Sequence, residues 1–402
     1  MSGNREEQVW WTVGVDCGEE RHRFVLLDEH GRRADGFWVD NRSDRIEEGV
    51  ARAMLAVPGE AKLRLATEGL RSLGWVLVKV AVELGVQVWQ VKTVALNHYR
   101  DLEGQPRKDD DIDGYLAARM VFGEMEGCHL AVDPRPEERA LCRLSRLRSR
   151  QLKQRTSAKN RLRSRLLELA PEVVGRGWIG PVHNGKGMRA VLRRWPGFEG
   201  LEKARRSTIE KLLRRTTRYG SRCSDMANEL KEMAGRIRMD PIEREAFKVE
   251  LRMALDEVEF LEKAIDELEK QLASRVTQHP VGRKLLAMPG VGVITAASDI
   301  GEVLPVARNV SEGKAATYAG LTPLSRLSGK TAKNGNGPGP SKLARGVNKY
   351  AATANYLSAI AATSSSAIDA AYHRKQKERH RGHPKAHVKA TLSLARQRFK
   401  VK

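Results

Sequence analysis

Val13-Gly14-Val15-Asp16 is a short apolar segment that ends in a single acid. Such a run of β-branched residues is typical of a central sheet strand, and an acid that closes the strand lies at the rim of the sheet. Residues 63–69 form a second alternating run, and its carboxylate, Glu68, also comes near the end. We therefore expect two strands that bring one acid each to a common rim.

A third source of acids is a cluster at the start of a predicted helix, residues 110–122. Residues 108–114 hold four aspartates, among them Asp110 and Asp113. Carboxylates from two strands and a helix form the oxygen-rich site that Mg²⁺ prefers when phosphate oxygens and water supply the remaining ligands. The sequence therefore predicts metal-dependent phosphodiester chemistry.

The N-terminal elements come in an informative order. Three strands joined by short turns, followed by strand–helix units, are typical of a ribonuclease-H-like (RuvC-like) α/β domain. A Rossmann domain is disfavoured because no glycine-rich dinucleotide loop follows the first strand. The predicted elements are strands at 11–16, 22–28 and 36–40, a helix at 43–56, a strand at 62–68, a helix at 72–84 and a strand at 86–91.

Charge is unevenly distributed along the 402 residues, whose net charge is +22. Residues 1–135 hold 18 Lys and Arg against 24 Asp and Glu, whereas residues 136–402 hold 54 against 26. A slightly acidic module joined to a strongly basic remainder indicates a metal-dependent site that is delivered to a polyanion.

The segment 136–170 predicts a long basic helix that begins at Pro136 and ends before Pro171. Its middle, residues 143–165, holds ten basic residues and no acidic one over about 34 Å of helix. Any single one of them fits a solvated face, but a run of one sign favours contact with nucleic acid. The candidate contacts are Arg143, Arg146, Arg150, Lys153, Arg155, Lys159 and Arg161.

Residues 172–242 have weak periodicity, and we predict only two short helices there, near 199–215 and 223–237. Residues 243–276 are clearer, because apolar residues such as Leu251 and Val258 recur at heptad spacing. This pattern predicts a coiled coil of about five heptads. Self-association and an intramolecular helical arm both fit it.

The C-terminal part is predicted to be helical, with a helix-hairpin-helix-like element at residues 285–295 around Pro289-Gly290-Val291-Gly292. Such a hairpin can present N–H groups to a phosphate or serve only as a structural turn. Further on, Ser328 precedes a glycine and lies between Arg326 and Lys330. It fits an exposed nucleophile, although an ordinary loop serine has the same pattern.

The four cysteines show neither Cys-x-x-Cys spacing nor the density of a disulfide scaffold, so we expect free thiols. No stretch approaches the roughly 18 apolar residues of a membrane span, and the first residues lack a signal-peptide core. We expect a cytoplasmic protein with no membrane contact.

Taken together, these motifs resemble the DEDD transposases of bacterial insertion sequences. In that family the N-terminal domain is similar to the RuvC Holliday-junction resolvase, and the C-terminal domain supplies a serine. The matching motifs, in order, are Asp16 after the first strand, Glu68 in Ala-Thr-Glu-Gly, Asp110 and Asp113 in Lys-x-Asp-x-x-Asp, Pro-Gly-Val-Gly before a helix, and Ala-Gly-Leu-Thr-Pro leading to Ser328.

The resemblance implies a catalytic domain at 8–135, a basic helix with helical insert and coiled coil at 136–277, and a serine-bearing domain at 278–402. It implies Mg²⁺ held by Asp16, Glu68, Asp110 and Asp113, with no other cofactor, and a covalent Ser328–DNA link. It also implies donor and target DNA, a structured guide RNA and a place at the bacterial nucleoid. From the coiled coil we expect a homo-oligomer, a dimer or a tetramer that forms through that segment. Three acids in a row, Asp109 to Asp111, leave the register of the third ligand open.

Two other functions compete with a recombinase. One is a metal-dependent junction endonuclease that uses water as the nucleophile and leaves hydrolysed ends. The other is an inactive nucleic-acid scaffold, which is disfavoured because a scaffold gains nothing from four mutually repelling carboxylates.

Overall fold

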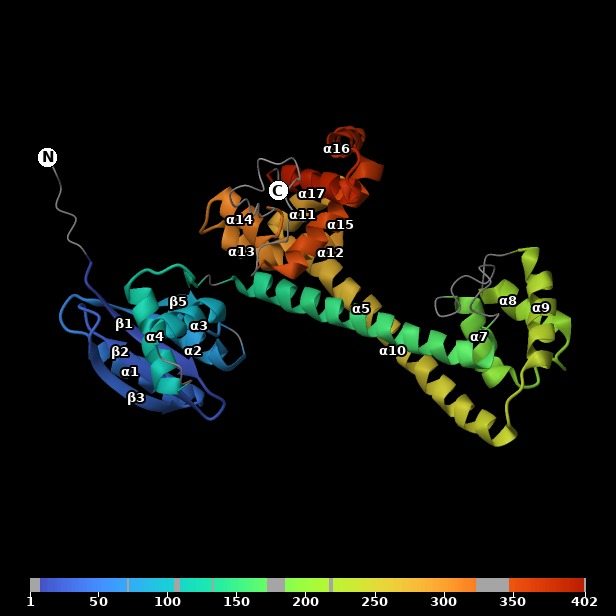
Figure 1. Cartoon of the computed structure of the whole chain (residues 1–402), viewed down its shortest axis with the longest axis horizontal. Coiled ribbons are helices and arrows are strands. Elements are labelled where there is room, and N and C mark those ends of the chain that lie inside the picture. Colours follow the sequence, from blue (N-terminus) through green and yellow to red (C-terminus); the bar gives the residue numbers. More distant parts are fainter. Residues whose placement is uncertain are drawn as a thin grey trace. The chain divides into compact units, whose positions relative to one another are not determined.

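The computed structural model describes residues 8–70, 72–104, 109–131, 134–171, 185–216, 220–322 and 347–400. It divides into two compact units, Met1–Asp133 and Pro134–Lys402 (Figure 1). The predicted residues Arg326, Ser328 and Lys330 lie outside the described residues. Each unit is described by itself below.

The N-terminal unit is built on a six-stranded mixed sheet in the order β3-β2-β1-β4-β5-β6. Its central strand pairs antiparallel with β2 and parallel with β4, and β5 continues the parallel part. The predicted ribonuclease-H-like arrangement is confirmed, and a short sixth strand was not predicted. The strands are β1 (Trp10–Cys17), β2 (Arg21–Leu27), β3 (Arg33–Asp40), β4 (Lys62–Thr67), β5 (Gln87–Val91) and β6 (Cys128–Leu130).

Helices cover both faces of this sheet. On one face, apolar residues of β1 and β2 such as Val15 and Phe24 pack with α1 (Ser43–Leu55) and α2 (Trp75–Glu83), which follows the turn η1 (Ser72–Gly74). On the other face, Ala66 packs with α3 (Thr93–Leu102) and α4 (Asp110–Phe122). The sequence prediction missed α3 but located the other three helices.

Two glycines bring α4 into direct contact with the central strand. A Cβ atom on Gly14 would overlap the carbonyl oxygen of Gly114, so no larger residue fits there without moving the helix. This close approach fixes the first turn of α4 beside the end of β1 that carries Asp16. The local sequence therefore positions the acid cluster.

The C-terminal unit contains a long antiparallel pair formed by α5 (Pro136–Leu169) and α10 (Pro241–Gln278). The start of α5 shares a core with the end of α10, and the end of α5 shares one with the start of α10. Heptad residues of α10, such as Leu251 and Val258, are buried in this pairing. Of the two interpretations of the heptads, the structure shows the intramolecular arm.

Helices pack at both ends of this arm (Figure 1). The predicted helices near 199–215 and 223–237 are present with shifted starts, and one helix before them was missed. At one end lie α7 (Lys186–Arg194), η2 (Pro196–Phe198), α8 (Arg206–Thr216) and α9 (Arg222–Arg236). At the other lie α11 (Pro280–Leu286), α12 (Val293–Ser298), η3 (Asp299–Val303), α13 (Leu304–Ala307), α14 (Glu312–Tyr318), α15 (Lys349–Ser365), α16 (Ala367–Arg379) and α17 (Ala386–Phe399).

The hairpin between α11 and α12 has the predicted form and packs against α15. Gly290 has a positive φ of 74°, and a Cβ atom there would overlap the backbone of Ala362 and the carbonyl oxygen of Ser358. Arg398 of α17 also donates to the carbonyl oxygen of Pro289. These contacts favour the structural interpretation of the hairpin.

None of the helices in the described ranges combines the length and apolarity that a bilayer span requires. The four cysteines are free thiols, as expected.

Candidate nuclease site and a buried polar network

Asp16 and Glu68 lie at the same end of two neighbouring strands. The parallel register pairs Val15 of β1 with Thr67 of β4, so the next residue on each strand is one of the two acids. Burial raises the pKa of Cys17 to about 11, although a hydrogen bond with Thr67 lowers it. The negative charges of Asp16 and Glu68 also raise this pKa. Both carboxylates therefore lie close to one thiol, as the sequence predicted for the sheet rim.

The three consecutive acids at the start of α4 have three different environments. Asp109 caps the helix, and its carboxylate accepts from the Asp111 N–H at 2.8 Å. Asp111 accepts from Arg33 at 2.7 Å and from Arg23 at 2.6 Å. These hydrogen bonds, that from Arg33 foremost, hold the pKa of Asp111 below its ordinary value although partial burial opposes them.

Asp110 is exposed, and its carboxylate has no hydrogen bond or ion pair with any residue that the structure describes. Of its two neighbours, Asp109 caps the helix and Asp111 forms ion pairs with Arg23 and Arg33. The arrangement therefore favours Asp110 as the available ligand in the run, which is the register that the family motif implies.

Asp113 follows one turn later and is buried. Its carboxylate accepts from Arg100 Nε at 3.1 Å and from Arg100 Nη2. Arg100 is itself buried, and it donates to the Asn97 side chain at 2.8 Å. This fourth acid is therefore already neutralised by an arginine of α3 that the sequence did not predict.

The donor set fits a divalent cation in its chemistry, because carboxylate oxygens from β1, β4 and α4 face one end of the sheet. Within the described ranges, however, no three His, Cys, Asp or Glu side chains are already grouped as metal ligands. Repulsion among the acids and the attraction of Arg100 both favour their separation. The four-residue ligand set stays a prediction.

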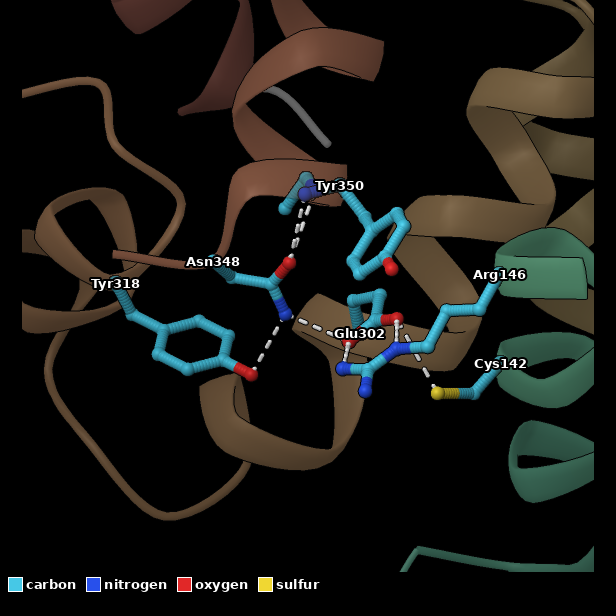
Figure 2. Close-up of polar contacts among 7 residues, drawn as sticks. Cys142, Arg146, Glu302, Tyr318, Asn348 and Tyr350 are labelled. Atoms are coloured by element: carbon cyan, nitrogen blue, oxygen red, sulfur yellow. Dashed lines mark hydrogen bonds and ion pairs between the residues drawn. The ribbon is translucent and has the colours of Figure 1, made fainter. Parts of the chain in front are cut away.

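The C-terminal unit holds a second polar site, a buried network centred on Glu302 of η3 (Figure 2). The Glu302 carboxylate accepts from Arg146 Nε at 2.5 Å and Nη2 at 2.6 Å. It also accepts from the Asn348 side-chain amide at 2.6 Å and from the Cys142 thiol at 3.2 Å. A buried carboxylate is thus satisfied from α5 and from the start of α15 together.

Asn348 connects this network to α14. Its side-chain amide also donates to the Tyr318 hydroxyl at 2.8 Å, and its backbone N–H donates to the Tyr318 carbonyl at 2.8 Å. Its side-chain oxygen caps α15 by accepting from the N–H groups of Tyr350 and Ala351. Residues 318 and 348 are therefore hydrogen-bonded to each other, and the predicted Ser328 lies between them in the sequence.

The predicted basic contacts on α5 divide into two groups. Three are bound within the chain: Arg146 by Glu302, Lys159 by Glu262 at 2.7 Å and Arg161 by Glu257 at 2.5 Å. Arg148 and Arg165 likewise meet Glu269 and Glu250. Part of the basic run is therefore balanced within the chain, by Glu302 of η3 and by acids of α10.

The second group contains three exposed residues, Arg143, Arg150 and Lys153. Of these, Arg150 and Lys153 form no ion pair with the described residues. Arg155 is half-buried, and its Nε has no partner in the described part of the chain. Apart from Arg146, the paired residues of α5 meet a row of glutamates on α10, and this row is the sequence signal that separates the groups.

Comparison with known families decides the identity of the chain. Residues 13–171 match the model of the DEDD transposases of IS110 type, described as a transposase. Residues 282–374 match the model described as transposase of the IS116/IS110/IS902 family. The chain belongs to the IS110 family of DEDD transposases.

Two relatives of this transposase come from Streptomyces coelicolor. An uncharacterized 43.6 kDa protein of insertion element IS110 is 26% identical over 409 aligned residues, covering 98% of this chain and 93% of the relative. A mini-circle protein named as a candidate transposase for IS117 is 24% identical over 347 residues, covering 81% and 79%. The similarity to the first relative spans both units.

Family membership makes this IS110-type transposase an enzyme of DNA cleavage and strand transfer, and the DEDD class implies a divalent metal. The first family match includes the positions of all four predicted acids. The second includes Glu302 and Asn348, which the sequence analysis did not single out. Asp299 and Glu302 are two acids in an otherwise apolar helical run, and that pattern could have drawn attention to Glu302.

Proposed function

We propose that this transposase cuts and rejoins DNA with Mg²⁺ held by Asp16, Glu68, Asp110 and Asp113 and with Ser328 as the nucleophile. The observation that carries the proposal is the adjacency of Asp16 and Glu68 at the ends of β1 and β4, with the exposed Asp110 on the helix that contacts β1. When bound, Mg²⁺ would polarise the scissile phosphate and stabilise charge on the leaving oxygen.

The serine step conserves one phosphodiester. Ser328 Oγ forms a bond to phosphorus while the bond from phosphorus to a sugar oxygen breaks, and the proton lost from Oγ balances the proton that the leaving oxygen gains. A hydroxyl of the partner strand then attacks the phosphoserine, and the serine recovers its proton. No external energy source is needed, because the ester keeps the bond energy.

The buried network supports this role for the serine segment. Tyr318 and Asn348 flank residues 323–346 in sequence and are tied to each other and to Glu302. Through Arg146, Glu302 also ties both flanks to α5. Rigid anchors on either side reduce the conformational freedom that a nucleophile must lose before it reacts.

The test is adduct trapping on nicked substrate DNA with the full-length transposase. We expect a covalent protein–DNA species with Mg²⁺ that is lost in Ser328→Ala and in Asp16→Asn, while Ser325→Ala retains it. Adducts in Ser328→Ala would move the assignment to another hydroxyl. Free hydrolysed ends with no adduct in the unchanged protein would instead establish the water-using junction endonuclease.

We also propose that a structured RNA guides the reaction and binds, with DNA, to the basic C-terminal unit. The support is the charge of residues 136–402 and the exposed Arg150 and Lys153 on α5. Sequencing the RNA that co-purifies with the transposase tests this part. Recovery of one dominant structured species supports it, and bulk cellular RNA alone contradicts it.

Self-association is proposed through a different surface from the predicted seam, which is buried within the chain. Four exposed apolar residues of α10 recur in heptad pairs: Ile242 with Val249, and Met253 with Phe260. This row suits a second copy of the same helix. We expect Met253→Lys with Phe260→Lys to reduce the mass measured by light scattering, whereas Leu357→Lys, at an exposed apolar position on α15, leaves it unchanged.

A further inference from the structure

The sheet of the N-terminal unit carries a row of functional side chains across three strands. Arg23 of β2 is the register partner of Asp16 on β1 and also of Trp38 on β3. Directly opposed residues in a sheet point to the same face, so Asp16, Arg23 and Trp38 share one face. Gly14, two residues before Asp16, places α4 on that same face.

Trp38 is unusually open for so large an apolar side chain, with 42% of its surface exposed. The Arg21 guanidinium lies 4.1 Å from the centre of its ring, and that of Arg23 lies 5.3 Å away. Arg21 and Arg23 alternate with the buried His22 on β2, so both are on the Trp38 face. An exposed indole is thus flanked by two cations beside the acid site.

The two arginines differ in how far the fold already uses them. Arg23 is largely buried, and its guanidinium binds Asp111 at 2.6 Å. Arg21 is exposed and forms no ion pair with the described residues. Arg23 is therefore a structural link to α4, whereas Arg21 still has its charge available for an anionic partner.

We infer that Trp38 and Arg21 form a stacking site for an unpaired nucleotide of the DNA substrate next to the scissile phosphate. This inference rests on the proposed function, because Asp16 marks where that phosphate lies. An exposed indole takes the face of a base, and an adjacent guanidinium takes its phosphate. Bases inside a duplex are stacked on one another and cannot offer that face.

The position of the site fits a strand that crosses the acid cluster. Asp16 and Trp38 are separated by two strand spacings, about 10 Å, and both belong to the same row. A nucleotide held at Trp38 would orient the strand whose neighbouring phosphate meets Asp16. Because every base has a π face, the contact would tolerate different sequences.

The experiment measures binding of the full-length transposase to a short fluorescein-labelled oligonucleotide by anisotropy, in buffer with EDTA so that no cleavage occurs. The same sequence is presented as single-stranded DNA, as duplex DNA and as single-stranded RNA. The variants are Trp38→Ala, Trp38→Phe and Arg21→Gln. The matched control is Arg45→Gln, which removes another exposed arginine, on α1 at the opposite face of the sheet.

We expect Trp38→Ala to weaken binding of single-stranded DNA at least about fivefold, from the loss of one base stack. Trp38→Phe should restore most of that affinity, since it keeps an aromatic face. Arg21→Gln should weaken binding and reduce its salt dependence, and Arg45→Gln should change neither. Duplex affinity should stay within about twofold, because a duplex offers no base face for the lost stack.

Three outcomes would overturn the inference: equal single-strand affinity in Trp38→Ala and Arg45→Gln, equal losses for single-stranded and duplex DNA, or a loss confined to RNA. Circular dichroism melting checks that each variant is folded. The result is independent of the serine chemistry, since Ser328→Ala should remove adducts and leave this binding unchanged. If Trp38→Ala still forms adducts and binds single-stranded DNA as tightly as the unchanged protein, the stacking site is refuted but the proposed function is not.

Discussion

Arg100 of α3 and Asp113 of α4 form a buried ion pair, with Arg100 Nε 3.1 Å from the Asp113 carboxylate. One of the four acids implied by the DEDD class therefore has a protein cation as its counter-ion. Metal binding at this acid would compete with, or share, the contact to Arg100. This makes Arg100 a direct probe of the proposed site.

Replacing Arg100 with Met should destabilise the N-terminal unit by about 3–5 kcal/mol, because it leaves a buried carboxylate uncompensated. Mg²⁺ should then recover more stability in Arg100→Met than in the unchanged protein, since a cation can take the place of the guanidinium. Thermal melting with and without Mg²⁺ measures both effects.

The control for Arg100→Met is Arg33→Gln, which removes one of the two arginines on Asp111 and leaves Arg23 in place. Its melting temperature should respond to Mg²⁺ as the unchanged protein does. If Arg100→Met gains nothing extra from Mg²⁺, Asp113 is not a ligand.

Asp111 should contribute to acid sensitivity. Its pKa is lower in the folded protein than the ordinary value of 3.8, owing mainly to the hydrogen bonds from Arg33. The stabilisation is therefore complete above the unfolded-state pKa and is lost as the pH falls through the folded-state pKa. Below about pH 4, the free energy of unfolding should decline less steeply in Asp111→Asn than in the unchanged protein.

Denaturant titrations at several pH values test this difference. The comparison variant is Asp110→Asn, whose carboxylate has no described partner and should leave the slope nearly unchanged. Parallel declines in Asp111→Asn and the unchanged protein would contradict the role of the two arginines.

Charge reversal on α5 should separate nucleic-acid contacts from internal ion pairs. Arg150→Glu with Lys153→Glu should flatten the dependence of RNA and DNA affinity on salt. With fewer phosphate contacts, binding releases fewer counterions. The melting temperature should change little, since neither residue pairs within the described chain. Filter binding over a salt series gives the slopes.

Lys159→Glu with Arg161→Glu is the matched pair on the same helix. These residues bind Glu262 and Glu257 of α10, so their reversal should lower the melting temperature. It should alter the salt slope less than the reversal of Arg150 and Lys153 does. Equal slopes in the two double variants would mean that Arg150 and Lys153 make no phosphate contact.

Asn348 has two roles that substitution can separate. Asn348→Ser keeps a helix cap for α15 but loses the donations to Glu302 and Tyr318. Asn348→Ala loses the cap as well as the donations. We expect Asn348→Ala to be about 1 kcal/mol less stable than Asn348→Ser. Both should slow adduct formation at an unchanged affinity for DNA, because the flanks of the serine segment lose their tie.

Urea unfolding and single-turnover adduct assays measure the two effects. Thr353→Ala, which removes an exposed hydroxyl from the same helix α15, is the control for unrelated changes. Adduct formation as fast in Asn348→Ser as in the unchanged protein would show that the network does not position the serine segment.

The sequence was sufficient for features that depend on local pattern. Strand β1 and its closing Asp16, the end of β4 with Glu68, and the proline-bounded α5 follow from periodicity and from capping residues. Helix α3, which directly follows β5, was not predicted although it is no shorter than α2. The ion pair of Arg100 with Asp113 was hidden for that reason.

Features that join distant segments could not be read from the sequence. Glu302 meets Arg146 across 156 positions and Asn348 across 46, and no local signal relates these residues. The heptads on α10 predicted a seam but not its partner, which depends on how α5 folds back. The assignments of Ser328, Arg326 and Lys330 stay predictions because these residues lie outside the described ranges.

The antiparallel arm of α5 and α10 is also a spacer whose length can be changed in steps of one heptad. Its buried residues recur every seven positions, and seven residues advance a helix by about 10.5 Å with about 20° of rotation. Inserting one matched heptad into both helices would move the α7–α9 helices away from the α11–α17 helices by that step and keep the seam in register. Reach along a bound nucleic acid is thus a property that paired insertions can adjust without rebuilding either end.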